Sequence, residues 1–165
     1  MKTEINNDLI RTFSPCYDPA EVGIDNKASL TVKEWVVKYR DTVKNKQNII
    51  WLLCRNDFMT DKDLRLFAVW CAREALKLIS DPDQRSVNAC DVAERFANGD
   101  VTSEELGAAW SAAWSAARSA VWDAAWSARD AAAESTARDA ADAAAFAATD
   151  AARSAQIDQL LTYFT

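Results

Sequence analysis

The chain has 165 residues, a length that suits one domain with its own core. It contains 25 acidic and 19 basic residues, no histidine, three glycines and three prolines. So few glycines and prolines argue against a turn-rich β-sandwich or barrel. The net charge of −6 argues against a nucleic-acid binder that neutralises phosphates. The absence of histidine removes both the commonest general base and the commonest metal ligand.

The four cysteines are widely spaced and include no C-x-x-C pair. We therefore expect no zinc site of standard spacing, and no cofactor or other metal. The first residues carry charges and lack the apolar block of a signal peptide. No apolar run reaches the roughly 18 residues of a membrane span. These features predict a cytoplasmic protein with reduced thiols and no contact with membranes or nucleic acid.

The expected architecture is a single all-α domain over residues 1–165, a compact bundle of about six to seven helices. Residues 1–30 are expected to be irregular, because turn-forming residues cluster in Ser14–Pro19. Residues 31–99 should form amphipathic helices and residues 102–165 alanine-rich helices.

The first two amphipathic helices have different signals. Thr31 can open a helix, and Glu34 three residues later completes a capping box. The apolar run Ile49–Cys54 predicts a short helix that is buried on most sides, with a strand as the alternative.

Two longer helices follow. Thr60 or Asp61 is expected to cap the first of them, which should end at Ser80–Pro82 because proline cannot continue a helix. The second should run from about Asp83 to Asn98, with Gly99 in the left-handed conformation just after it. An apolar stripe on the first is predicted to comprise Leu64, Phe67, Ala68, Cys71, Ala75 and Leu78.

The last part of the chain is rich in alanine, which has the highest helix propensity. Alanine accounts for 32 of the 165 residues, and 24 of these lie in 108–155, many spaced four residues apart. Because a step of four overshoots a helical turn by about 40°, such a row rotates from the core face towards solvent. Thr102 and Glu105 form a capping box at the start. An unbroken helix after Gly107 would extend about 87 Å, so a break is predicted within Ser127–Thr136.

A row of tryptophans and one arginine at i, i+4 spacing is a candidate binding site: Trp110, Trp114, Arg118, Trp122 and Trp126. In one interpretation, the rings fill core space that the small alanines leave. In the other, they form an exposed anchor surface, since tryptophan and arginine are enriched in binding hot spots. Both interpretations can hold if one tryptophan pair is buried and the other is exposed.

A second candidate group contains Arg73, Asp81 and Arg85. In the structural interpretation, Asp81 caps the following helix or pairs with Arg85 across its first turn. Alternatively, the two arginines could hold a phosphate or carboxylate of a ligand. Enzyme signals are weak, because there is no glycine-rich phosphate loop and no cysteine has an evident base nearby. We therefore predict no catalytic residues and no enzyme activity.

The segment Trp51–Gly99 contains WLLCRNDFMTDKDLRLFAVWCAREAL and then DPDQRSVNACDVAERFANG, before the alanine- and tryptophan-rich part. This pattern resembles the Imm5-like family of immunity proteins, whose relatives also occur as small bacterial and phage proteins. The similar positions are Arg73, Asp81, Arg85, Asp91 and Gly99, and residues 1–45 lie outside the resemblance. The resemblance implies an all-α protein in which an acidic residue, an arginine and an amphipathic helix precede alanine repeats.

The resemblance also implies that the chain neutralises a toxin, or a host or defence protein, by direct protein–protein contact. The acidic charge would suit a partner with a basic surface. The alternative is an anti-defence protein that sequesters a nucleotide-like signal in a pocket of tryptophan and arginine. A structural helical subunit is a further alternative.

Overall fold

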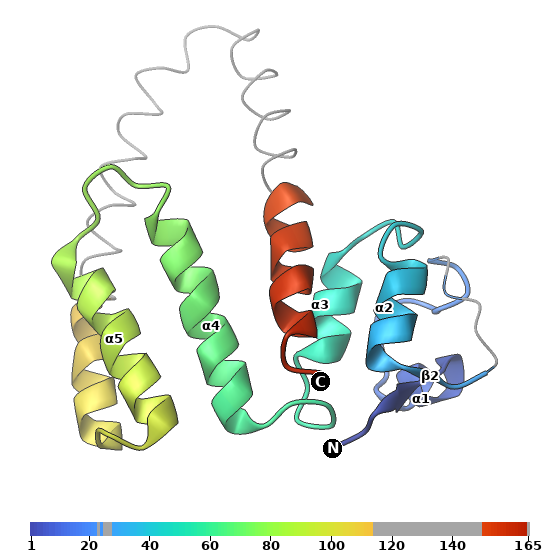
Figure 1. The fold of residues 1–165 in the computed structure, drawn as a ribbon, viewed down its shortest axis with the longest axis horizontal. Coiled ribbons are helices and arrows are strands. Elements are labelled where there is room, and N and C mark those ends of the chain that lie inside the picture. Colours follow the sequence, from blue (N-terminus) through green and yellow to red (C-terminus); the bar gives the residue numbers. More distant parts are fainter. Residues whose placement is uncertain (23, 25–27, 114–149, 165) are drawn as a thin grey trace, which may run out of the picture. The chain divides into compact units, whose positions relative to one another are not determined.

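A computed structural model describes residues 1–22, 24, 28–113 and 150–164. In these ranges the chain forms seven helices and one two-stranded sheet, so the predicted all-α fold class is confirmed (Figure 1). The chain divides into two compact units, which we call unit 1 (Met1–Thr60 with Thr149–Thr165) and unit 2 (Asp61–Ala148). Within the described ranges, no helix is long and apolar enough to cross a membrane.

The small sheet of unit 1 pairs β1 (Glu4–Ile5) with β2 (Leu30–Thr31) in antiparallel register. Glu4 lies opposite Thr31. The two strands thereby hold the start of the chain against the start of the helix that begins at Val32. Residues 1–30, expected to be irregular, contain β1, the helix α1 and the first residue of β2.

Helix α1 (Asn7–Thr12) forms because the residue before it is a good cap and its apolar side chains are buried. The Asn6 side chain accepts a hydrogen bond from the backbone N–H of Leu9 at 2.8 Å. Ile10 is fully buried, as are Ile5 before the helix and Ile24 after it. The expectation of an irregular segment is wrong here, because these isoleucines are too far apart in the sequence to show a periodic pattern.

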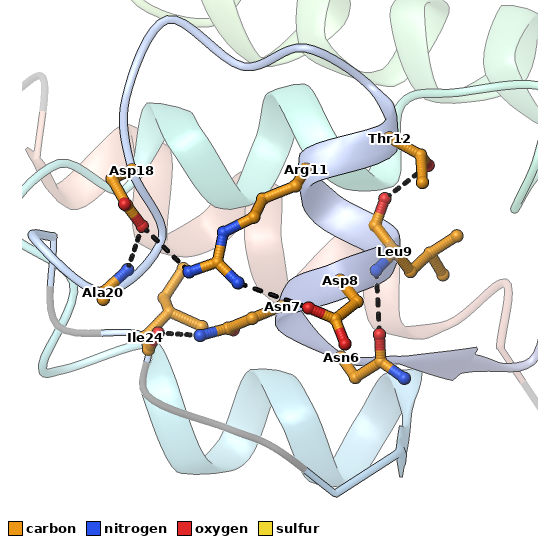
Figure 2. A network of polar contacts seen from close by, with 9 residues as sticks. All are labelled: Asn6, Asn7, Asp8, Leu9, Arg11, Thr12, Asp18, Ala20 and Ile24. Atoms are coloured by element: carbon orange, nitrogen blue, oxygen red, sulfur yellow. Dashed lines mark hydrogen bonds and ion pairs between the residues drawn. The ribbon is translucent and has the colours of Figure 1, made fainter.

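Polar side chains order the loop that follows α1 (Figure 2). The buried Asn7 amide donates to the backbone carbonyl of Ile24 at 2.5 Å. The Arg11 guanidinium donates to Asp8 at 3.3 Å and to Asp18 at 3.2 Å. The Asn7 bond satisfies a backbone carbonyl that has no partner in a regular element, and the Arg11 contacts tie the loop to α1.

Helices α2 (Val32–Tyr39) and α3 (Gln47–Leu53) agree with the sequence predictions. At α2, Thr31 and Glu34 form the predicted capping box. The run Ile49–Cys54 is helical as far as Leu53, so the strand alternative is wrong. Four apolar side chains of α3 are buried, which explains why the run is apolar on most sides.

The helix over 150–161 completes unit 1, although it follows α3 by about a hundred residues. Ile157 and Leu160 each have 0% of their surface exposed. Two ion pairs join this helix to the first sixty residues: Arg40–Asp158 at 2.7 Å and Lys46–Asp150 at 2.8 Å. Unit 1 is therefore built from two segments that lie far apart in the sequence.

Unit 2 contains α4 (Asp61–Leu76), α5 (Gln84–Asn98) and a helix over 103–113. Gly99 ends α5 at φ 86° in the left-handed region, as predicted. The predicted capping box of Thr102 and Glu105 is also present, with the Glu105 carboxylate accepting from the Thr102 backbone N–H at 2.8 Å.

The predicted apolar stripe on α4 is partly wrong. The helix ends at Leu76, and Leu78 lies in the following turn with 87% of its surface exposed. Phe67 is buried as expected, and Val69, which was not in the stripe, is buried as well. Ala68 and Ala75 are exposed because they line a groove.

The predicted break within Ser127–Thr136 lies outside the described residues, as do most of the alanine rows.

Candidate functional site

An apolar groove of about 590 Å³ lies among the three described helices of unit 2, and we call it the unit 2 groove. Its walls are formed mainly by small and aliphatic side chains. Helix α4 contributes Ala68, Val69, Ala72, Ala75 and Leu76. Helix α5 and the helix over 103–113 contribute Ala89, Cys90, Ala93, Leu106, Trp110 and Ala113.

The sequence explains the shape of this groove. Alanines at 68, 72 and 75 share one face of α4, and alanines at 89 and 93 share one face of α5. A methyl side chain leaves the space beside the helix backbone open, where a leucine or phenylalanine would fill it. The outcome is a hollow with mainly aliphatic walls, whose volume lies in the range typical of small-molecule sites.

Trp110 lies in the wall of the groove and has 63% of its surface exposed. This exposure agrees with the anchor-surface interpretation for this ring. Trp114, Arg118, Trp122 and Trp126, the other members of the predicted row, lie outside the described residues.

Arg73 is engaged in holding two helices of unit 2 together. Its guanidinium lies 2.9 Å from Asp91 and 2.6 Å from Glu94, so it links α4 to α5. The hydrogen bonds to Glu94 and then Asp91 raise the pKa of Arg73. Because both partners are carboxylates, the positive charge of Arg73 is already neutralised and is not left to bind the phosphate of a ligand.

Arg85 likewise forms an ion pair with a neighbour, Asp83, at the start of α5. Asp83 caps α5 by accepting the Arg85 backbone N–H at 2.8 Å, and its other oxygen lies 2.6 Å from the Arg85 guanidinium. These hydrogen bonds, the side-chain ones first, lower the pKa of Asp83 to about 2. The predicted cap, Asp81, is wrong: the helix begins at Gln84, so the capping position falls on Asp83.

The second candidate group is therefore not brought together as a ligand pocket. Arg73 and Arg85 each bind carboxylates of the chain, and neither lines the unit 2 groove. Asp81 is exposed in the turn before α5.

Cys90 is the buried thiol of the groove wall. Burial raises its pKa, which the nearby Arg73 opposes and the nearby Asp91 reinforces. A thiol with a raised pKa stays protonated at neutral pH and is a poor nucleophile. In the described part of the chain, no group of three or more cysteines, aspartates or glutamates is placed to hold a metal ion.

Arg65 is a groove residue that sequence analysis did not single out. It is the charged side chain among the described residues of the wall, and its guanidinium lies over the Phe96 ring at 4.8 Å from the centroid. The available signal was its position: Arg65 precedes Ala68, Ala72 and Ala75 on the alanine face of α4.

Comparisons of this chain with protein-family models, with curated proteins and with solved structures find no match.

Proposed function

We propose that this chain is a non-enzymatic binding protein of the immunity type, which neutralises a toxin or a defence protein through the unit 2 groove. The observation that carries the proposal is Trp110, a largely exposed ring in the wall of an apolar groove. Tryptophan is enriched in binding hot spots, and an apolar groove with an exposed tryptophan in its wall is a candidate site for contact with another protein.

The charge of the chain supports a protein partner of opposite sign. At a net charge of −6, complementary charge on a basic partner would accelerate association and help exclude other acidic proteins. Many toxins and defence proteins that act on nucleic acid need a basic surface for that contact.

Sequestration of a nucleotide-like ligand is the weaker alternative. A phosphate needs cations that are not already neutralised, whereas Arg73 and Arg85 both pair with carboxylates. The walls of the groove are also almost entirely apolar, which favours aliphatic side chains of a partner over a polar ligand.

The test compares two alanine-to-arginine variants of the full chain as baits for partner capture. Ala72→Arg fills the groove, whereas Ala108→Arg places the same side chain at an exposed position of the helix over 103–113, outside the groove. We expect the wild type and Ala108→Arg to bind one protein near equal stoichiometry and to inhibit its purified activity. Ala72→Arg should do neither.

Two results would contradict this function. Retention of partner binding by a folded Ala72→Arg variant would remove the groove from the interface. Release of a nucleotide-like molecule from the denatured wild type, without any inhibited protein, would favour sequestration.

A further inference from the structure

We propose that the unit 2 groove receives an amphipathic helix of the partner, and that a carboxylate on this helix pairs with Arg65. This inference rests on the proposed function and names the element that the groove would recognise. It depends on the shape of the groove and on the charge of one residue in its wall.

The shape of the groove suits a helix. From Arg65 to Leu76 the groove follows α4 for about 17 Å, or roughly three helical turns. The alanine faces of α4 and α5 allow another helix to approach at the close end of the usual range of about 8–10 Å. Recognition of this kind places partner side chains at i, i+3 or i+4 and i+7 into an apolar groove.

The charge of the wall selects the partner helix. Ion pairs occupy Arg73 and Arg85, but no carboxylate of the described residues lies within 4.0 Å of the Arg65 guanidinium. Arg65 instead lies over the Phe96 ring, which leaves the edge of its planar guanidinium suited to a carboxylate. A helix with an acidic residue next to its apolar face would meet this need.

The position of Arg65 also indicates where along the groove the carboxylate of the partner helix would lie. Arg65 is the first residue of α4 to line the groove, next to the end of α5 that carries Phe96. Its positive charge is opposite in sign to the net charge of the chain. The long-range field would therefore attract a basic partner, while the charge of Arg65 would favour the helix end that carries a carboxylate.

The test uses two synthetic helical peptides and the full-length chain. Each peptide has about 18 residues, with leucines at i, i+3, i+4 and i+7, and the two differ only in a glutamate or a lysine beside the apolar face near one end. Binding is measured by fluorescence anisotropy to the wild type and to Arg65→Glu. Arg95→Glu serves as the control, because Arg95 lies on α5 outside the groove.

We expect the wild type and Arg95→Glu to bind the glutamate peptide about five-fold more tightly than the lysine peptide, as for a partly exposed ion pair. Arg65→Glu should reverse this preference, and Arg65→Gln should abolish it without reversal. Circular dichroism checks that each variant is folded.

Three outcomes would overturn the inference. They are binding of neither peptide to the wild type, a preference that Arg65→Glu leaves unchanged, and an equal loss of preference in Arg95→Glu. Failure of the proposed function would look different. If Ala72→Arg abolishes partner inhibition but Arg65→Glu does not, the groove is the interface and only the carboxylate partner is wrong.

Discussion

Removal of the Leu160 side chain should destabilise the part of unit 1 that comes from the first sixty residues. Leu160 has 0% of its surface exposed and lies on the helix over 150–161, which packs with that part. Replacing a fully buried leucine with alanine costs about 2–5 kcal/mol, from lost burial and from the cavity left behind. Because domains are stable by only about 5–15 kcal/mol, the loss is a large share of the total.

The matched control is Leu161→Ala, on the next residue of the same helix. Leu161 is only partly buried, so the same change should cost about 1 kcal/mol. At a cost of about 3 kcal/mol, Leu160→Ala should speed amide exchange governed by opening of unit 1 roughly 100-fold, against about five-fold for Leu161→Ala.

Hydrogen–deuterium exchange of the full chain reads this effect in α2 and α3, about a hundred residues or more away in sequence. We expect the amides of both helices to lose protection in Leu160→Ala. Unchanged protection of α2 and α3, with faster exchange only in the helix over 150–161, would refute the reasoning. That result would mean that the first sixty residues are stable without the last helix.

Three other predictions concern single side chains. In urea denaturation, Trp110→Ala should lower the free energy of unfolding by about 1 kcal/mol or less, because the ring is largely exposed. Trp35→Ala should lower it by about 3–5 kcal/mol, because Trp35 has 0% of its surface exposed. Equal losses would contradict the surface position of Trp110. The pKa of Asp83 is lowered from 3.8 to about 2, so the charge of this carboxylate stabilises the fold fully above pH 3.8, and this stabilisation is lost as the pH falls through about 2. The difference in unfolding free energy between the wild type and Asp83→Asn should therefore close between pH 3.8 and about 2. In thermal unfolding, Gly99→Ala should destabilise the fold by about 1 kcal/mol, because residue 99 has a positive φ. Gly107→Ala should stabilise it by about 0.5–1 kcal/mol, because Gly107 lies within a helix and the space that a Cβ would occupy is open. An effect of the same sign for both variants would contradict the assigned backbone.

The features that sequence predicted well depend on neighbours in the chain. The capping boxes at Thr31 and Thr102 need two side chains three residues apart, and Gly99 needs only its own backbone freedom. The short helix at 47–53 was predictable because its apolar run is bounded by polar residues. Each of these signals is local, and tertiary structure does not override it.

The features that sequence missed depend on distant residues. Nothing near Ile5 or Ile10 indicates that they are buried in a core shared with Ile157 and Leu160, about 150 residues later. The cap of α5 was misplaced by two residues, because Asp81 and Asp83 flank a proline and both have the right chemistry. Only the geometry of the turn decides between them.

Alanine has two consequences in this chain, and only one of them was predictable from the sequence pattern. Its high helix propensity correctly predicted a helix at 103–113, and its small size predicted close helix packing. Yet the same small size makes an alanine face a poor filler of space. Where α4, α5 and the helix over 103–113 present such faces to one another, they leave a groove whose largest described side chain, Trp110, stays exposed in its wall. A helix that could fold on alanine propensity alone still needs large apolar side chains against it to gain stability from burial. In the proposed function, the partner supplies those side chains, which is why Ala72→Arg should abolish binding while leaving helix propensity nearly unchanged.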